Sequence, residues 1–278
     1  MEPEQIKVQN APGDVYAWRR ASSTRAIMAV HGFTGSGLDF ESFAASLPGE
    51  FSLYALDLAG HGSAAHVSAA TDNSLDSLAT SLSETIRALS LERPVVLGYS
   101  MGGRVALHHA LRHPDEVGAL VLVGAKAGLD DAKEREARRL ADERLADEIE
   151  ARGLGWFLEY WSAHEMIRSQ RRIPQPYLER WDLRRSAGAP VGLASSLRNA
   201  GLGAMEPLWS VLSELEPRTL FVCGEQDERH RSIAQDMAKS IPNGRVAIVP
   251  GCGHAANFEE PSTFAALFLD WLRSINDR

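Results

Sequence analysis

Short runs of apolar residues alternate along the chain with longer segments in which apolar residues recur every three or four positions. The short runs are typical of buried strands, and the longer segments are typical of helices with one apolar face. Strands are predicted at residues 4–9, 14–19, 26–30, 51–58, 94–99, 117–125, 218–224 and 245–250. Helices are predicted at residues 74–91, 101–113, 230–240 and 262–274. This alternation predicts an α/β fold, in which helices cover both faces of a mostly parallel sheet.

The alternation is interrupted between about residues 126 and 213. Residues 130–153 form a charge-dense helical pattern, and an aromatic segment with further helical patterns follows it. Most of the charged run is expected to face solvent. Its candidate buried positions are Leu140, Leu145 and Ile149. We therefore predict one domain over residues 1–278, with residues 126–213 inserted as a helical cap.

Composition and charge narrow the class of protein. The 278 residues are 44% hydrophobic and 24% charged, with a net charge of −8, which argues against a nucleic-acid partner. No apolar run approaches the ~20 residues that cross a bilayer, and the first residues do not resemble a secretion signal. Two cysteines are too few for a disulfide scaffold. We expect a cytoplasmic monomer or small homo-oligomer with no membrane partner.

The segment Gly98-Tyr99-Ser100-Met101-Gly102 fits the pattern G-x-S-x-G between a predicted strand and a predicted helix. Glycines on both sides allow the strand and the helix to approach closely while the serine takes a strained backbone conformation. The hydroxyl is then raised above the carboxyl edge of the sheet, beside a helix N-terminus that attracts negative charge. An incidental serine in a glycine-rich turn is the alternative.

Two candidate partners follow Ser100 in the order acid, then histidine. Asp227 comes just after a predicted strand, and His254 lies in the loop after the next strand. An imidazole can accept the serine proton, while a carboxylate on its other nitrogen fixes the tautomer and stabilises the imidazolium. Glu225 and Asp57 compete with Asp227 for the role of the acid.

The loop His31-Gly32-Phe33 follows the first strand of the parallel run. In such a loop the backbone N–H of Phe33 can join that of Met101 as an oxyanion hole, and a simple turn is the alternative. Gly35 and Gly37 form no phosphate loop, because no Gly-Lys-Ser/Thr follows them, and no cofactor is predicted.

The other histidines have structural explanations. Those expected at a helix end, where positive charge is favoured, are His108, His109 and His113. Those expected in loops or at the surface are His61, His66, His164 and His230. His109 and His113 have the spacing of metal ligands, but no third ligand is evident and no metal site is predicted.

Positive charge is expected above the serine. Arg104 lies four residues after Ser100, on the same helix face, and a cation in the first helical turn opposes the helix dipole. Either a carboxylate partner or an anionic substrate must compensate it. Further candidate cations are Arg135, Arg138, Arg139, Arg184 and Arg185. Trp161 either lines the same cavity or packs within the cap.

The sequence resembles the α/β-hydrolase superfamily in "HGFTGS", "DLAGHG", "GYSMGG", "GEQD" and "GCGHAANFEEP", which occur in the family's order. Within it, "GYSMGGRVAL", the run from Glu134 to Asp142, a Trp before Ser-Gln, and "GLASSLRNAGLGAMEPLW" resemble the 2-succinyl-6-hydroxy-2,4-cyclohexadiene-1-carboxylate synthases of menaquinone biosynthesis. The resemblance implies a lyase that removes pyruvate from a cyclohexene tricarboxylate. A serine activated by histidine would abstract a ring proton from this substrate.

The resemblance also implies roles for individual residues. The implied catalytic triad is Ser100, Asp227 and His254. The implied substrate-binding residues are Tyr99, Arg104, Arg138, Trp161 and Arg185, the last replaced by Arg184 if the alignment gap falls differently. The chain departs from the family pattern at Asn257, where a second histidine is common, and at Arg229-His230, where the family has lysine and phenylalanine.

Guanidinium groups suit such a substrate, because they bind carboxylates through two parallel hydrogen bonds. The predicted partner is therefore a small, carboxylate-rich anion. Two other interpretations stay open. One is a hydrolase of the same fold that acts on an ester or a carbon–carbon bond, and the other is a non-catalytic ligand receptor. The complete triad argues against the receptor, and the arginines argue against a generic esterase.

Overall fold

The computed structural model describes residues 2–9, 11–68 and 71–276. Eight strands form one sheet in the order β1-β2-β4-β3-β5-β6-β7-β8. They are β1 (Glu4–Ile6), β2 (Val15–Trp18), β3 (Arg25–Val30), β4 (Phe51–Leu56), β5 (Val95–Tyr99), β6 (Ala119–Val123), β7 (Thr219–Gly224) and β8 (Gly244–Val249). Strand β2 pairs antiparallel with β1 and β4, and every other pairing is parallel. The predicted mostly parallel sheet is confirmed.

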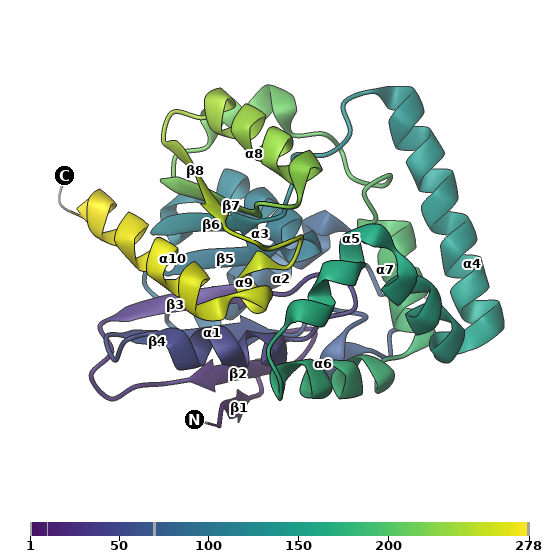
Figure 1. The fold of residues 1–278 in the computed structure, drawn as a ribbon, viewed down its shortest axis with the longest axis horizontal. Coiled ribbons are helices and arrows are strands. Elements are labelled where there is room, and N and C mark those ends of the chain that lie inside the picture. The colour runs from purple at the N-terminus through teal and green to yellow at the C-terminus, as the bar shows by residue number, and fades with distance from the viewer. Residues whose placement is uncertain (1, 10, 69–70, 277–278) are drawn as a thin grey trace.

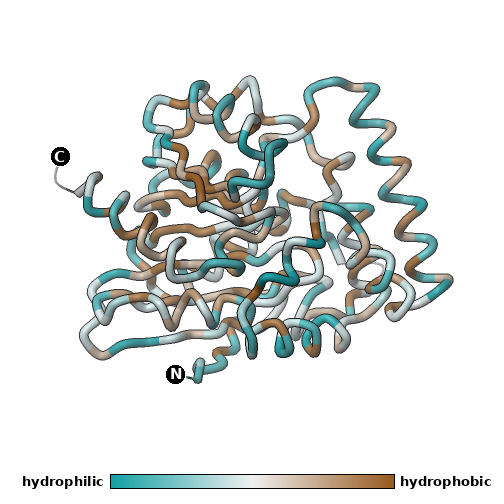
Figure 2. The backbone as a smooth tube through the Cα atoms, viewed as in Figure 1, coloured by the Kyte–Doolittle hydropathy of each residue, from teal (hydrophilic) through white to brown (hydrophobic). Residues whose placement is uncertain are grey.

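Helices cover both faces of this sheet (Figure 1). The helices packed on one face are α2 (Leu75–Ala88), α3 (Met101–Arg112) and α8 (Glu228–Ser240), and those on the other are α1 (Glu41–Ser46), α9 (Ala256–Glu259) and α10 (Pro261–Asn276). Short 3₁₀ helices are η1 (Gly37–Phe40), η2 (Gly62–Ala64), η3 (Pro114–Glu116), η4 (Ser169–Arg172) and η5 (Trp209–Glu214). Figure 2 shows the apolar character concentrated in the central strands.

Four helices lie between β6 and β7 and sit together at one side of the sheet (Figure 1). They are α4 (Ala132–Ala163), α5 (Glu165–Arg168), α6 (Tyr177–Ser186) and α7 (Pro190–Ala200). The apolar side of α4 packs on α7, where Ala146, Ile149 and Phe157 meet Leu193, Ala194 and Leu197. The remainder of α4 is polar, as its colouring in Figure 2 shows.

The expected buried face of α4 is partly wrong. Ile149 is buried and Leu145 is half-buried, but Leu140 is 41% exposed. Asp142 is buried, and a residue two positions away on a helix points about 200° around the axis. Leu140 is apolar but points toward solvent, because the buried side of α4 carries Asp142 and Ile149.

The elements that the sequence pattern missed are short. Helix α1 has six residues and α9 has four, which is too few for a helical period to be recognised. Among the described residues, no helix combines the length and the apolar character that a bilayer span requires.

Candidate active site

Ser100 lies at a sharp turn between β5 and α3. Its φ is 52° and its ψ is −109°, a conformation that is costly for a residue with a side chain. A Cβ on Gly98 would lie 2.4 Å from the carbonyl oxygen of Gly102, and a Cβ on Gly102 would lie 2.2 Å from that of Val30. Glycine at both positions is therefore what allows the strand and the helix to cross so closely.

His254 joins Ser100 to Asp227. Its Nε2 lies 3.0 Å from Ser100 Oγ, and its Nδ1 lies 2.8 Å from Asp227 Oδ2. Asp227 follows β7 and His254 follows β8, so neighbouring parallel strands bring both to the sheet edge that carries Ser100. A carboxylate accepts from Nδ1–H only in the tautomer whose Nε2 is free to take the serine proton. The geometry is that of a catalytic base.

The ionisation of the acid and the base fits this arrangement. Burial raises the pKa of Asp227, but hydrogen bonds from His230 and His254 outweigh burial and hold that pKa well below its ordinary value. Burial lowers the pKa of His254, against the hydrogen bond from Asp227, which raises it. At neutral pH the carboxylate is therefore charged and the imidazole is neutral, as a general base must be.

The two competing carboxylates hold loops instead. Asp57 accepts hydrogen bonds from the backbone N–H groups of Gly37 and Ser63, each at 2.7 Å. Glu225 accepts from the backbone N–H of Gly251 at 2.9 Å. Asp227 is the one of the three candidates that the structure brings to His254.

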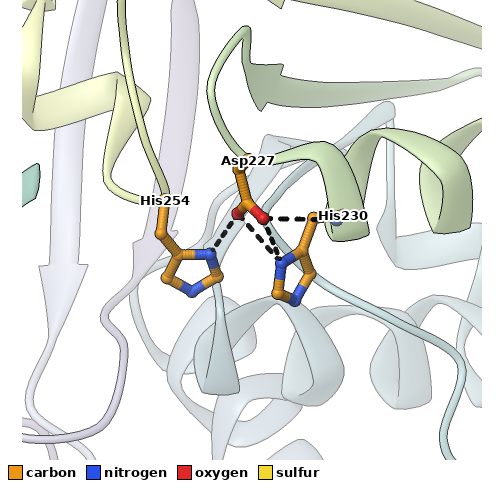
Figure 3. A group of neighbouring side chains, drawn as sticks. All are labelled: Asp227, His230 and His254. Carbon is orange, nitrogen blue, oxygen red and sulfur yellow. Dashed lines mark hydrogen bonds and ion pairs between the residues drawn. The ribbon is translucent and has the colours of Figure 1, made fainter. Parts of the chain in front are cut away.

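Asp227 also binds a second imidazole (Figure 3). His230 Nδ1 lies 2.9 Å from Asp227 Oδ1, and the ring centroids of His230 and His254 are 4.5 Å apart. His230 is 7% exposed and belongs to α8, so the expectation of a loop or surface position is wrong. The available signal was its spacing, because a residue three positions after a helix N-cap faces that cap.

These three side chains are also the part of the described chain where histidine, cysteine or carboxylate ligand atoms gather most closely, within 4.8 Å of one another. Both imidazole Nδ1 atoms already lie within hydrogen-bond distance of the same carboxylate. These hydrogen bonds account for the grouping, and we assign no metal to it.

Phe33 and Met101 lie on two backbone turns that contact each other. A Cβ on Gly32 would lie 2.8 Å from the Tyr99 ring, and a Cβ on Gly102 would lie 2.4 Å from the carbonyl oxygen of His31. The loop after β3 therefore rests directly on the start of α3, as an oxyanion hole built from both turns would need.

Trp161 packs edge-on against the Phe33 ring, with the ring centroids 5.3 Å apart. It also contacts Phe157, which is fully buried in the cluster between α4 and α7. Trp161 therefore packs among the helices between β6 and β7 and contacts Phe33 in the loop after β3.

A chain of hydrogen bonds joins Tyr99 to the cap. Gln170 Nε2 donates to the Tyr99 hydroxyl at 3.2 Å, and Gln170 Oε1 accepts from Arg185 Nη2 at 2.8 Å. The Arg185 guanidinium also lies over the Trp181 ring, 4.6 Å from its centroid. Arg185 is thereby held on the side of the cap that faces Tyr99.

The neighbouring Arg184 is engaged elsewhere. Its Nε lies 2.9 Å from Asp39 Oδ1, and its Nη1 lies 3.3 Å from Glu41 Oε1. These ion pairs neutralise its charge and fasten α6 to the segment around η1. The sequence motif is compatible with either Arg184 or Arg185 as the substrate-binding arginine. Of the two, Arg185 is the one connected to Tyr99.

Arg104 and Arg138 belong to one polar network below α4. Arg104 Nη1 donates to the carbonyl oxygen of Ala200, the last residue of α7, at 2.7 Å. Arg138 Nε lies 2.7 Å from Asp142 Oδ1. Burial and the charge of Arg138 lower the pKa of Arg104 to about 10, against Asp142. The positive charge of Arg104 is thus partly compensated by the C-terminus of α7, whose carbonyls carry partial negative charge.

Sequence analysis missed Lys126 as a member of this group of cations. Burial lowers the pKa of Lys126 to about 8, together with the nearby charges of Arg229, Arg138 and Arg104. Lys126 comes two residues after Gly124, where a Cβ would lie 2.8 Å from His254 Cε1. Arg104, Arg138 and Arg229 therefore lie within electrostatic range of Lys126, in the segment that follows β6. The available signal was the position of Lys126 directly after a strand of the parallel run.

Comparison with known proteins agrees with this geometry. Residues 25–261 match the family model of the alpha/beta hydrolase fold. The chain is 34% identical over 254 residues to a putative 2-succinyl-6-hydroxy-2,4-cyclohexadiene-1-carboxylate synthase of Bacillus subtilis, covering 91% of this chain and 92% of that one. This chain belongs to that synthase family, within the α/β hydrolases. The resemblance seen in the motifs is confirmed.

Two solved structures extend the comparison. MenH from S. aureus superimposes with a TM-score of 0.87 at 26% identity, covering 94% of this chain and 98% of that one. A thermophilic esterase from Thermogutta terrifontis superimposes with a TM-score of 0.78 at 23% identity, covering 99% of both chains. The esterase likeness shows the shared fold alone, whereas the synthase family is matched in sequence as well.

The close crossing at Ser100 yields a first prediction. Gly98→Ala is expected to abolish activity and to destabilise the protein, because its Cβ would lie 2.4 Å from backbone that cannot move independently. Gly155→Ala is the matched control, since a Cβ there meets nothing within 4 Å. Thermal unfolding and turnover of both variants measure the difference. Equal behaviour of the two variants would contradict the proposed constraint.

Proposed function

We propose that the chain eliminates pyruvate from 2-succinyl-5-enolpyruvyl-6-hydroxy-3-cyclohexene-1-carboxylate and releases 2-succinyl-6-hydroxy-2,4-cyclohexadiene-1-carboxylate. It is then a carbon–oxygen lyase built on an α/β-hydrolase scaffold. The observation that carries the proposal is a hydrogen-bonded Ser-His-Asp triad in a chain of this synthase family, and the group of cations around Lys126 supports it.

The triad supplies the base in this reaction. His254 Nε2 takes the proton of Ser100 Oγ, and the serine oxygen takes a proton from a ring carbon of the substrate. The electron pair of that C–H bond forms one new ring double bond, the existing ring double bond shifts by one position, and the carbon–oxygen bond to the enolpyruvyl group breaks. The leaving group receives a proton from the His254 imidazolium and departs as pyruvate. Asp227 stabilises the imidazolium in the interval.

The two backbone turns hold the negative charge that develops on the substrate. We assign the oxyanion hole to the N–H groups of Phe33 and Met101, whose loops are in direct contact. Fixed N–H dipoles stabilise such a charge without having to reorganise during the reaction.

The cations bind the carboxylates of the substrate. Arg104, Lys126 and Arg138 form the cationic side of the site, and each charged hydrogen bond contributes on the order of 1.5–3 kcal/mol. Tyr99, Trp161 and Arg185 form the opposing side. Trp161 Nε1 and Arg185 Nε are buried and have no hydrogen-bond partner within the described part of the chain. Both are N–H donors that a carboxylate-rich substrate would satisfy.

The cap completes the site. We assign residues 126–213 to a cap within one domain of residues 1–278, because α7 and η4 both bind side chains that surround Ser100. A cytoplasmic location and a monomeric or small homo-oligomeric state stay predictions from the sequence.

Release of pyruvate is the direct test of the reaction. The wild-type protein is expected to release one pyruvate for each substrate consumed, followed by coupled reduction. Ser100→Ala should lower kcat by roughly 10⁴-fold or more, because the triad acts as a unit. Ser240→Ala, an exposed serine in α8, is the control. Ester hydrolysis without pyruvate release would favour the hydrolase instead.

The proposed carboxylate-binding role of Arg138 is tested by comparison with Arg139, its neighbour on α4. Arg138→Ala should lower kcat/KM by about 10- to 100-fold, the loss of one charged hydrogen bond to substrate. Arg139→Ala is the matched control, because Arg139 is on the same helix and pairs with Glu136 and Glu143. Steady-state kinetics compare the two, and equal effects would show that Arg138 is not part of the site.

Lys126 predicts a dependence of KM on alkaline pH. Its pKa of about 8 means that its charge, and the attraction for a carboxylate, is present below that pH and lost above it. KM should therefore rise between about pH 7 and pH 9. Lys126→Arg should remove the rise, because a guanidinium keeps its charge over this range. A Lys126→Met variant that retained the wild-type pH dependence would contradict this assignment.

A further inference from the structure

The Asp227 carboxylate contacts two imidazole rings, and the triad roles use one of them. We infer that His230 is a positioning residue of the triad, which holds the Asp227 carboxylate through both of its oxygens and takes a share of its negative charge. The inference rests on the proposed function only for the reaction that is measured, because the contacts themselves are independent of the substrate.

The geometry fixes the carboxylate in one orientation. Asp227 Oδ2 accepts from His254 Nδ1 at 2.8 Å, while Asp227 Oδ1 lies 2.9 Å from His230 Nδ1 and 3.3 Å from its backbone N–H. His230 Nδ1 also lies 2.9 Å from Asp227 Oδ2, and Figure 3 shows the carboxylate bridging the two neighbouring rings. Rotation about the side-chain torsions of Asp227 would break contacts with both histidines.

His230 is itself held firmly. Asp227 is the N-cap of α8 and His230 lies in the first turn of that helix, so the backbone and the ring of His230 approach the same carboxylate. The backbone carbonyl of His230 accepts from Cys223 Sγ at 3.4 Å, which ties this turn to β7. The centroids of the His230 and His254 rings are 4.5 Å apart, so the two rings are in contact.

The second donor changes the balance of charge around His254. The charged and titratable groups that act on His254 are Asp227, His230 and Glu259, and the Tyr99 ring packs against it with the centroids 5.5 Å apart. Burial lowers the pKa of His254, the Asp227 hydrogen bond raises it, and His230 lowers it. A carboxylate that already receives one imidazole N–H has less negative charge to offer the other. His230 thus favours the neutral, proton-accepting form of His254.

His230 is therefore expected to widen the pH range of activity on the acid side. A base that protonates at lower pH stays active at lower pH, so His230 extends activity toward acid. It also keeps Asp227 aligned, which affects the chemical step rather than substrate binding. Loss of His230 is therefore expected to lower kcat and to move the acid limb of its pH profile to higher pH, with little change in KM.

The experiment compares variants that remove the donor with one that keeps it. His230→Phe and His230→Leu remove the ring nitrogen, while His230→Asn places an amide N–H near the position of Nδ1. The pH midpoint of the His254 imidazole is followed by NMR in the full chain, without substrate. The pH dependence of kcat and KM for pyruvate release is measured in parallel.

In His230→Phe the His254 midpoint should rise by about half a pH unit or more. The acid limb of kcat should rise with it, kcat at its optimum should fall several-fold, and KM should change by less than about two-fold. His230→Asn should return kcat and the midpoint toward the wild-type values. If the phenylalanine variant does not fold, the leucine variant provides the same comparison.

Two outcomes would overturn the inference. One is a His254 midpoint that is unchanged in the variants without the donor, even where thermal stability falls, because that result describes a merely structural residue. The other is an asparagine variant as impaired as the phenylalanine variant. If the protein released no pyruvate, the NMR midpoints would still decide the role of His230, so its failure is distinguishable from failure of the proposed function.

Discussion

The close crossing of β5 and α3 is the constraint on which the site depends. Gly98 and Gly102 leave no space for a Cβ, and the turn between them holds Ser100 at a φ of 52°. The Ser100 N–H donates to the carbonyl of Val123 in β6 at 2.8 Å, so the sheet itself supports the strained residue. Because Ser100 is fixed to the sheet, neighbouring strands need only end beside it to bring the histidine and the acid into contact.

Positive charges are grouped in one part of this acidic protein. The net charge of the chain is −8, yet Arg104 and Arg138 lie within electrostatic range of Lys126. Salt screens distant charges, so the nearest charged groups set the electrostatic potential that an anion experiences at contact. Arg184 shows the contrast, because two carboxylates neutralise it within the protein. Arg104 is held by a backbone carbonyl oxygen and Arg185 by an amide oxygen, and these neutral partners leave the charge available to a ligand, while Arg138 shares its charge with Asp142.

The cap and the catalytic histidine share hydrogen bonds. Glu259 accepts from Ser169 in η4 at 2.7 Å, and also from the backbone N–H groups of Gly253 and Ala255, on either side of His254. The next residue of η4, Gln170, binds Tyr99 and Arg185 as described above. A displacement of η4 would therefore disturb both the loop that presents His254 and the arginine beside the substrate. The cap is part of the catalytic geometry as well as its cover.

The sequence by itself determined the parallel sheet, the turn at Ser100 and the order of serine, acid and histidine, because each is a local pattern of apolar runs, glycines and strand ends. Only the tertiary structure decided that His230 binds Asp227, that Lys126 joins the cations, and that Arg185 rather than Arg184 is connected to Tyr99. Adjacent helical residues point about 100° apart, and sequence alone does not say which of them faces the core. Contacts between elements distant in sequence settle that choice, and they exist only once the chain has folded.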